Sequence, residues 1–301
     1  MKLRHLAVSV LIGAVLLSGC GSKQTMAPVV SASPSSTAVH QESSGLVSSE
    51  SAPSLTGTNS AEGSSSGSSA VLSRTASSVT YIPPVLKSVA ESAEASPSFL
   101  DHAVFVGDSV TLKLKNYVLK KRKSDPGFFG TAAFLTAGSM GSGNALQPLG
   151  KDSIHPYYNG EKALLEDSAA KMGADKVYLM LGINDVAPYG VEGAAENLET
   201  LTKRFCDKIP GVKIYIQSAT PMLADKQKKT LNNPNLERYN KLVSEICEKD
   251  GWYFLDVASG MRDDTGSLKR NYCSDPDDLG LHFTDAACDV WIHYILTHTG
   301  G

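Results

Sequence analysis

The sequence has no Phe, Trp or Tyr before Tyr81, and its N-terminal apolar run is short. That run extends only from Leu6 to Leu17, whereas a membrane-spanning helix needs about 20 apolar residues. Lys2 and Arg4 make a basic start before the run. The N-terminus therefore fits a secretory signal better than a transmembrane anchor.

A large excess of charge of one sign is also lacking. The chain has 28 Lys and Arg residues against 31 Asp and Glu residues, which gives a formal net charge of −3. This balance does not indicate a nucleic-acid partner. The one basic run, residues 112–123, suits the solvent face and the C-terminal end of a helix. No internal repeat is visible, and we expect a monomer.

Cysteine pairs with metal-binding spacing are absent. The chain has five cysteines, and none of them forms a C-x-x-C pair, so we expect no zinc site, no other metal and no cofactor. A disulfide between Cys273 and Cys288 would close a loop around His282 in an extracellular protein. Burial of Cys206, Cys247, Cys273 and Cys288 as small apolar side chains is equally consistent with the sequence.

The apolar run ends in Leu17-Ser18-Gly19-Cys20, which resembles a bacterial lipobox. The resemblance implies that residues 1–20 are a lipoprotein signal peptide and that Cys20 becomes the lipidated first residue of the mature protein. Lipid chains on Cys20 would hold the protein to the outer face of the cell membrane without any spanning segment.

Two further segments follow the lipobox. Residues 21–95 are dominated by Ser, Ala, Thr, Gly and Pro up to about residue 80, a composition too poor in apolar groups to form a core. We interpret them as a disordered tether whose last part, from Tyr81, could form a short helix on the domain surface. Residues 96–301 are numerous enough for one sizeable hydrophobic core.

Within residues 96–301, short apolar strands alternate with helical patterns. The predicted strands are 103–107, 132–136, 176–181, 212–217 and 252–257, and the predicted helices are 110–121, 160–172, 191–208, 235–248 and 284–297. Continuous apolar strands separated by helices indicate a parallel sheet that is covered on both faces. The sequence therefore predicts a three-layer α/β/α sandwich with a five-stranded parallel sheet of flavodoxin-like type, whose active site lies at the carboxyl ends of the strands.

Several chemically suggestive segments fall at those ends. Gly107-Asp108-Ser109 follows the first strand, a glycine-rich loop follows the second, and Gly182-Ile183-Asn184-Asp185 follows the third. His282 lies in a loop just before the final helix. Serine is a preferred helix N-cap, so Ser109 could cap the next helix, act as a nucleophile, or do both.

Together these segments resemble the blocks of the SGNH (GDSL-type) hydrolase family, and the likeness covers roughly residues 100–298. The resemblance implies a serine esterase in which Ser109 is the nucleophile and His282 is the base. It also implies that the oxyanion donors are the backbone N–H of Ser109, a glycine N–H and the Asn184 side-chain amide. Such donors stabilise the negative oxygen of the tetrahedral intermediate.

Two positions in this assignment stay open. Gly138, Gly141 and Gly143 share one loop, and Gly141 best matches the position of the family's glycine. The family has an aspartate three residues before its histidine, but Leu279 occupies that position here. We expect either that Asp278 orients the imidazole or that a backbone carbonyl does so in a Ser-His dyad.

Other residues and other functions fit less well. Asp185 is expected to hold its loop rather than to touch substrate, and His155 is a distant second to His282. A G-x-S-x-G elbow, a G-x-G-x-x-G loop and a Walker lysine are all absent at the relevant loops. We therefore expect hydrolysis of acetyl or other short acyl esters on an extracellular carbohydrate or cell-wall polymer. The alternatives are a lipase or lysophospholipase, and an inactive glycan-binding protein of the same fold.

Overall fold

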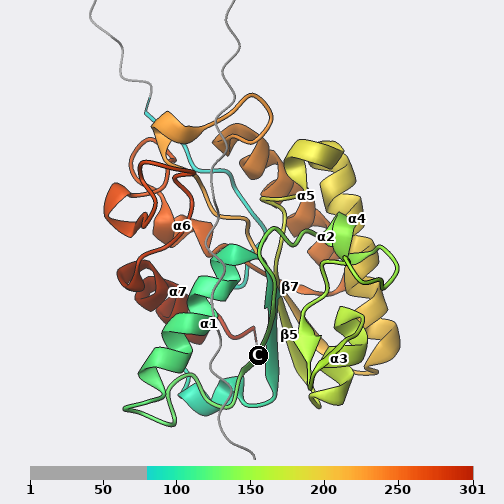
Figure 1. Cartoon of the computed structure of the whole chain (residues 1–301). Helices are drawn as coiled ribbons and strands as arrows, with labels where there is room; N and C mark the ends of the chain where they lie inside the picture. Colours follow the sequence, from blue (N-terminus) through green and yellow to red (C-terminus); the bar gives the residue numbers. More distant parts are fainter. Residues whose placement is uncertain (1–79, 301) are drawn as a thin grey trace, which may run out of the picture. The chain divides into compact units, whose positions relative to one another are not determined.

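The structure is a computed structural model that describes residues 80–300 (Figure 1). The predicted signal peptide, Cys20 and nearly all of the predicted tether lie outside the described residues. Within residues 80–300, no helix is long and apolar enough to cross a membrane.

Five parallel strands form the central sheet in the order β2-β1-β5-β6-β7. They are β1 (Ala103–Gly107), β2 (Ala133–Thr136), β5 (Lys176–Met180), β6 (Lys213–Gln217) and β7 (Tyr253–Leu255). The register aligns the carboxyl ends, because Gly107 pairs with Thr136 on one side and with Met180 on the other. The predicted parallel sheet is confirmed, and its carboxyl ends form one common edge.

Helices cover both faces of this sheet, which confirms the predicted three layers. In Figure 1, α1 (Ser109–Lys121) and α7 (Asp285–Thr297) lie on one face of the sheet. The helices α3 (Leu165–Lys171), α4 (Val186–Lys208) and α5 (Asn233–Asp250) lie on the other. Two one-turn helices, α2 (Ser142–Ala145) and α6 (Ala258–Met261), occupy the loops after β2 and β7.

An aromatic ladder crosses four neighbouring strands and supports their register. The rings of Phe105, Tyr178, Tyr215 and Tyr253 are stacked in sequence, with centroids 4.5, 4.4 and 4.7 Å apart. These residues are also direct register partners on β1, β5, β6 and β7. Because a slip of one residue would turn every ring to the opposite face, the ladder disfavours other registers.

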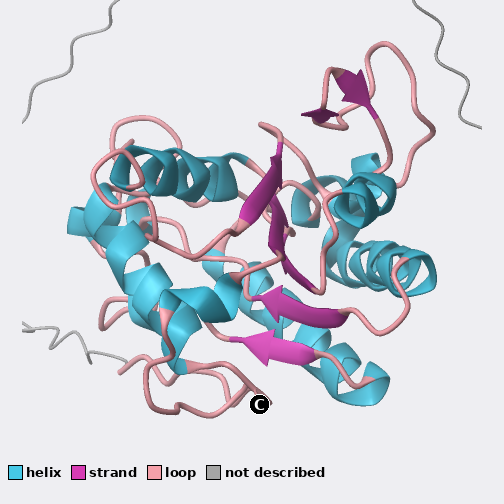
Figure 2. Cartoon of the chain, turned by 90° about the horizontal axis from the view of Figure 1, so that it is seen from below, coloured by secondary structure: helices cyan, strands magenta, loops and turns pink. Residues whose placement is uncertain are grey.

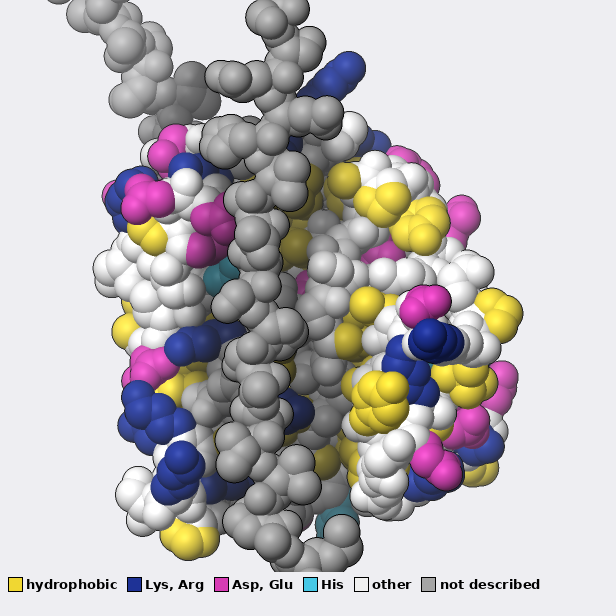
Figure 3. Space-filling model, viewed as in Figure 1, with side chains coloured by type: hydrophobic (Ala, Val, Ile, Leu, Met, Phe, Trp, Pro, Cys, Tyr) yellow, Lys and Arg dark blue, Asp and Glu magenta, His cyan; other side chains and the backbone are white. Residues whose placement is uncertain are grey.

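The basic run of residues 112–123 lies mostly on α1, as the sequence predicts. Figure 3 shows its Lys and Arg side chains gathered along one side of the molecule. The ammonium groups of Lys113 and Lys120 lie 2.5 and 3.0 Å from the Asp285 carboxylate, at the first residue of α7. These partly exposed ion pairs join two neighbouring helices, so the run has a structural role.

The predicted helix over residues 160–172 begins later than the sequence indicates, because a hairpin precedes it. Tyr157–Tyr158 (β3) pairs with Glu161–Lys162 (β4), and Figure 2 shows this hairpin projecting from the body of the protein. Asn159 and Gly160 connect the two strands with φ values of 50° and 84°. Two successive positive φ angles suit a tight hairpin turn, and Asn-Gly is its commonest sequence.

Residues 80–95 pack along the domain, so the predicted boundary at residue 96 is too late. The segment, here called the arm, is extended, and the short helix expected there is absent; only a 3-10 turn at Pro97–Leu100 follows. The Val89 N–H donates to Phe254 O on β7 at 2.9 Å. Further along, the Ser92 N–H donates to Thr297 O at 2.7 Å. The arm thus covers part of the edge strand β7, which would otherwise expose unpaired backbone groups.

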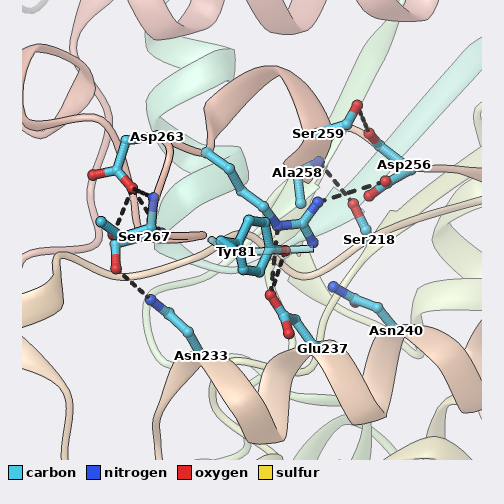
Figure 4. A network of polar contacts seen from close by, with 12 residues as sticks. Tyr81, Ser218, Asn233, Glu237, Asn240, Asp256, Ala258, Ser259, Asp263 and Ser267 are labelled. Carbon is cyan, nitrogen blue, oxygen red and sulfur yellow. Dashed lines mark hydrogen bonds and ion pairs between the residues drawn. The ribbon is translucent and has the colours of Figure 1, made fainter. Parts of the chain in front are cut away.

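A polar network also holds the start of the arm (Figure 4). The Tyr81 hydroxyl donates to Glu237 Oε1 on α5 at 2.6 Å. Nearby, the nearly buried Arg262 lies 3.9 Å from Glu237 and 3.6 Å from Asp256, which follows β7. One guanidinium therefore lies between two carboxylates, and these connect the arm, α5 and the end of β7.

Replacing Val89 with proline should destabilise the full chain, because proline has no N–H to donate to Phe254 O. We expect the free energy of unfolding to fall by about 1–3 kcal/mol, as estimated for losing one buried hydrogen bond and its local packing. Val85→Pro is the matched control, since Val85 is 94% exposed. Urea titrations measure both variants. Equal midpoints for Val89→Pro and the unmodified chain would mean that the arm contributes little to stability.

Candidate active site

Ser109 follows β1 and begins α1, but Asp108 is the residue that caps this helix. Asp108 has extended backbone angles, and its Oδ1 accepts a hydrogen bond from the Val110 N–H at 2.8 Å. The expectation that Ser109 serves as the cap is therefore wrong. As the first helical residue, Ser109 keeps a backbone N–H without an acceptor inside the helix, and its hydroxyl is free for other partners.

The turn before Ser109 requires a glycine. A Cβ at Gly107 would overlap the side chain of Thr111 and lie 2.8 Å from the carbonyl oxygen of Met180. Since Gly107 is also the last residue of β1, the helix can approach the sheet closely at this point. The close approach presents Ser109 at the carboxyl edge.

His282 and Ser109 meet at this edge although they are 173 residues apart in the chain. The His282 Nε2 lies 2.9 Å from the Ser109 Oγ, and its Nδ1 lies 2.7 Å from Asp275 Oδ2. The sequence expectation that these two residues act together agrees with this geometry. A serine hydroxyl, an imidazole and a carboxylate in a line can transfer a proton from the serine to the imidazole.

The carboxylate beside His282 belongs to Asp275, which corrects the choice of Asp278. Asp275 Oδ1 accepts hydrogen bonds from the backbone N–H groups of Leu281 and His282, at 3.1 and 2.9 Å. Burial alone would raise the pKa of Asp275, but the hydrogen bonds from His282 and from the Cys273 thiol outweigh it and lower the pKa. Asp275 is therefore held ionised and fixed from several directions.

A tight turn explains why the aspartate is seven residues before the histidine instead of three. The N–H groups of Asp278 and Gly280 both donate to the carbonyl oxygen of Asp275, at 3.0 and 3.1 Å. Gly280 has φ of 68°, a value that favours glycine. The turn folds Asp275 back toward His282 and leaves Asp278 exposed on its outer side.

Asn184 lies beside Asp108 at the end of β5. Its side-chain Nδ2 donates to Asp108 Oδ2 and to the carbonyl oxygen of Met140, both at 3.1 Å. These contacts fix the amide between the first and second strand-end loops. Burial raises the pKa of Asp108 to about 6, although the Val110 N–H opposes the shift. The ionised carboxylate is the form that accepts from both donors.

Asp185 holds the glycine-rich loop after β2, whereas the sequence analysis expected it to hold its own loop. Its fully buried carboxylate accepts hydrogen bonds from the N–H groups of Ser142 and Gly143, each at 2.9 Å. A Cβ at Gly141 would lie 2.6 Å from this carboxylate, so glycine is required for the close approach. Burial raises the pKa of Asp185, and the two backbone N–H groups oppose that shift.

The N–H of Gly141 is bonded within its own loop. It donates to Asn144 Oδ1 at 2.9 Å, and the Asn144 amide in turn donates to Ser139 O at 3.0 Å. Sequence reasoning missed Asn144, although a polar residue three positions after a helix start is a known capping signal. The structure thus places Gly141 beside Asp185 and Asn184, with its N–H directed at Asn144.

The remaining sequence candidates lie away from this arrangement. His155 is buried, and its Nε2 lies 3.0 Å from the carbonyl oxygen of Ala145, so it supports a loop. Cys273 and Cys288 are free thiols, as are Cys206 and Cys247, so the possible disulfide is not formed. Among residues 80–300, no group of three or more His, Cys, Asp and Glu side chains is arranged to hold a metal ion.

A comparison with models of known protein families shows the family of this chain. The model of the GDSL-like lipase/acylhydrolase family matches residues 105–290, which is more than half of the chain. The chain is also 27% identical over 145 residues to an N-acylneuraminate cytidylyltransferase of Streptococcus agalactiae. That match covers 46% of this chain and 33% of the relative, so the chain spans about a third of the relative's length.

Solved structures of low sequence identity resemble the fold. A GDSL-like lipase from Bacteroides thetaiotaomicron is 15% identical, with 64% of this chain and 84% of that chain covered and a TM-score of 0.47. An acetylxylan esterase from Geobacillus stearothermophilus is 15% identical, with coverages of 70% and 96% and a TM-score of 0.48. A lipase/acylhydrolase from Enterococcus faecalis is 16% identical, with coverages of 64% and 93% and a TM-score of 0.44.

Replacing Asp275 with asparagine should lower kcat by up to about 10⁴-fold, because the amide no longer favours the tautomer with a proton on Nδ1. Asp278→Asn is the matched control and should stay within about twofold of the unmodified protein, since Asp278 is exposed. Ester hydrolysis measures kcat, with Ser109→Ala as the background. Near-normal rates in both aspartate variants would indicate a Ser-His dyad, and a loss confined to Asp278→Asn would contradict the geometry.

Proposed function

We propose that this chain, which belongs to the GDSL-like lipase/acylhydrolase family, is a carboxylic ester hydrolase that removes acetyl or other short acyl groups from an extracellular carbohydrate or cell-wall polymer. The observation that carries the proposal is the unbroken line from Ser109 Oγ through His282 to Asp275, with distances of 2.9 and 2.7 Å. An inactive glycan-binding protein would not need this alignment.

In the proposed reaction, the Ser109 Oγ attacks the ester carbonyl carbon while His282 Nε2 takes its proton. The carbonyl oxygen becomes an oxyanion that receives a hydrogen bond from the Ser109 N–H. The Asn184 amide adds a second hydrogen bond when it exchanges one of its two acceptors, Asp108 Oδ2 or Met140 O, for the oxyanion. Gly141 joins as a third donor when the Asn144 side chain turns away from its N–H. His282 then returns the proton to the leaving alcohol, and water releases the acyl group by the same steps.

One narrow hollow lies among the residues at the carboxyl ends of β1, β5 and β6, and Ser109 does not line it. This hollow is lined by Asp108 and Val110, on either side of the serine, and by Ile183, Ala219 and Thr220 among others. It contains about 180 Å³ of empty space between its walls but no point wide enough for a water-sized sphere. This hollow has no room for an acyl group of any length, so it does not decide the acyl preference.

The larger hollows in the described part of the chain lie elsewhere. One of about 350 Å³ is lined by Tyr81 and Arg262, and one of about 470 Å³ by Glu91 and Tyr294. Another of about 280 Å³ lies between α4 and α5. Neither Ser109 nor His282 lines any of these hollows or the narrow one, so the hollows do not distinguish a short-chain esterase from a lipase or lysophospholipase.

Hydrolysis of p-nitrophenyl esters from acetyl to palmitoyl tests the acyl preference. We expect kcat/KM to be highest for acetyl and to fall by at least about tenfold by the octanoyl ester, since each misplaced methylene costs roughly 1–3 kcal/mol. Ser109→Ala should reduce all rates to background, and a chelator should have no effect. A maximum at octanoyl or longer would favour the lipase. Activity at background in the unmodified protein would favour the glycan-binding protein.

We also propose that Cys20 carries lipid chains and that the Ser-rich segment after it tethers the enzyme to the outer face of the cell membrane. This proposal depends on the sequence alone, namely the short apolar run that ends at Leu17-Ser18-Gly19-Cys20. A surface-tethered esterase would meet cell-wall polymers and extracellular polysaccharides, which supports the proposed substrates.

Mass spectrometry of the mature N-terminus tests the anchor. We expect the first residue to be Cys20 with added lipid mass, and we expect Cys20→Ser to appear in the medium without that mass. Cleavage well downstream of Cys20, or an unmodified thiol at that position, would contradict the anchor. Neither result would affect the assignment of the hydrolase site, since that depends on residues 80–300.

A further inference from the structure

A half-exposed aromatic ring lies on the same segment as Asn184. Tyr189 is 44% exposed, and it follows Asn184 by five residues in the first turn of α4. Among the exposed large apolar side chains of the described residues, Tyr189 and Leu279 lie within five residues of a site residue, Leu279 being 37% exposed and three residues from His282. Leu119, 45% exposed, lies on α1 but ten residues beyond Ser109. Exposed apolar groups beside a catalytic site are candidates for contact with substrate.

The backbone of α4 breaks directly after this tyrosine. Gly190 has φ of 73° and ψ of 174°, which are not helical values. A Cβ at Gly190 would meet nothing within 4 Å, so the positive φ and not crowding explains the glycine. The break separates the turn Val186–Tyr189 from the rest of α4. It therefore fixes the direction of Tyr189 independently of the long helix that covers the sheet.

The ring of Tyr189 lies against α2, close to the proposed oxyanion donors. A Cβ at Gly143 would overlap this ring, so the ring packs directly on the glycine backbone. The N–H of the same Gly143 donates to Asp185 at 2.9 Å, and the Tyr189 N–H donates to Asp185 O at 2.9 Å. The hydroxyl end of the ring thus rests on Gly143, two residues from Gly141, and the residue remains 44% exposed.

We propose that the Tyr189 ring is the platform on which the sugar ring of the ester lies, an inference that rests on the proposed carbohydrate esterase function. A sugar ring has C–H groups on its faces and hydroxyl groups at its edge. The tyrosine matches this pattern, because it has an apolar face and a polar hydroxyl at the ring edge.

Kinetics with two non-aromatic substrates test the platform. The substrates are ethyl acetate, which has no sugar, and partially acetylated cello-oligosaccharides, with acetate release followed by titration. Tyr189→Ala should raise the KM for the oligosaccharides by about tenfold or more, as the loss of one stacked ring predicts. Its kcat/KM for ethyl acetate should stay within about twofold of the unmodified enzyme.

Two further variants separate stacking from other roles. Tyr189→Phe keeps the ring and should retain a KM within about threefold of the unmodified enzyme. Tyr157→Ala removes another exposed tyrosine, which lies on the β3–β4 hairpin and is 69% exposed. It should leave the KM for the oligosaccharides and the kcat/KM for ethyl acetate unchanged. Thermal melts of each variant check that the fold is intact.

The outcomes distinguish the platform from the proposed function. Equal losses on both substrates for Tyr189→Ala would mean that the ring supports the loop around Gly143, which overturns the platform. A loss of activity confined to ethyl octanoate, assayed as a third substrate, would place the acyl chain on the ring and also overturn the platform. If the unmodified enzyme cleaves both substrates and Tyr189→Ala matches it on both, only the platform is wrong. If the unmodified enzyme cleaves ethyl acetate but no acetylated oligosaccharide, the carbohydrate substrate is wrong and the platform falls with it.

Discussion

The hydrogen bonds of the Asp108 carboxylate are the interaction on which the rest of the site depends. One oxygen caps α1 through the Val110 N–H, and the other holds the Asn184 amide. The same carboxylate therefore positions the helix that begins at Ser109 and a donor from the end of β5. If Ser109 were the cap instead of Asp108, its hydroxyl would be bonded to a backbone N–H of the helix and not to His282. The hydrogen bond between the capping residue and Asn184 would also be lost.

This arrangement favours function at a cost in stability. Burial raises the pKa of Asp108 from its ordinary value of 3.8 to about 6, so the folded protein binds a proton that the unfolded chain releases near pH 4. The contribution of Asp108 to stability is therefore full below about pH 4 and is lost as the pH rises through about 6. The ionised form, which accepts from both donors, is thus the less stabilising one. Asp185 has the same direction of shift because of burial, and its carboxylate fixes the loop of Gly141.

The parts of the molecule that follow local patterns could be predicted from the sequence. Apolar strands such as 103–107 and 213–217 have both faces buried, so their composition identifies them whatever their partners. The hairpin at Asn159-Gly160 had a clear turn signal that a helix prediction overlooked. The arm could not be predicted, because its order comes from backbone bonds to Phe254 and Thr297, which are far away in the chain. The same limit applies to Tyr81, whose partner Glu237 is 156 residues away.

The aspartate of the site shows why spacing alone is a weak guide to a catalytic residue. An aspartate can reach the Nδ1 of His282 from several sequence positions, provided that the turn between the two residues brings its carboxylate next to the imidazole. Here the turn contains Pro276 and closes through Gly280, so four extra residues fit between Asp275 and the histidine compared with the family's spacing. The exposed Asp277 and Asp278 lie on that turn and are nearer to His282 in sequence, yet Asp275 is the residue bonded to the His282 Nδ1. The backbone carbonyl of Asp275 closes the turn by accepting the N–H groups of Asp278 and Gly280. Its carboxylate accepts the N–H groups of Leu281 and His282 and also bonds the His282 Nδ1. One residue therefore both forms the loop and orients the imidazole.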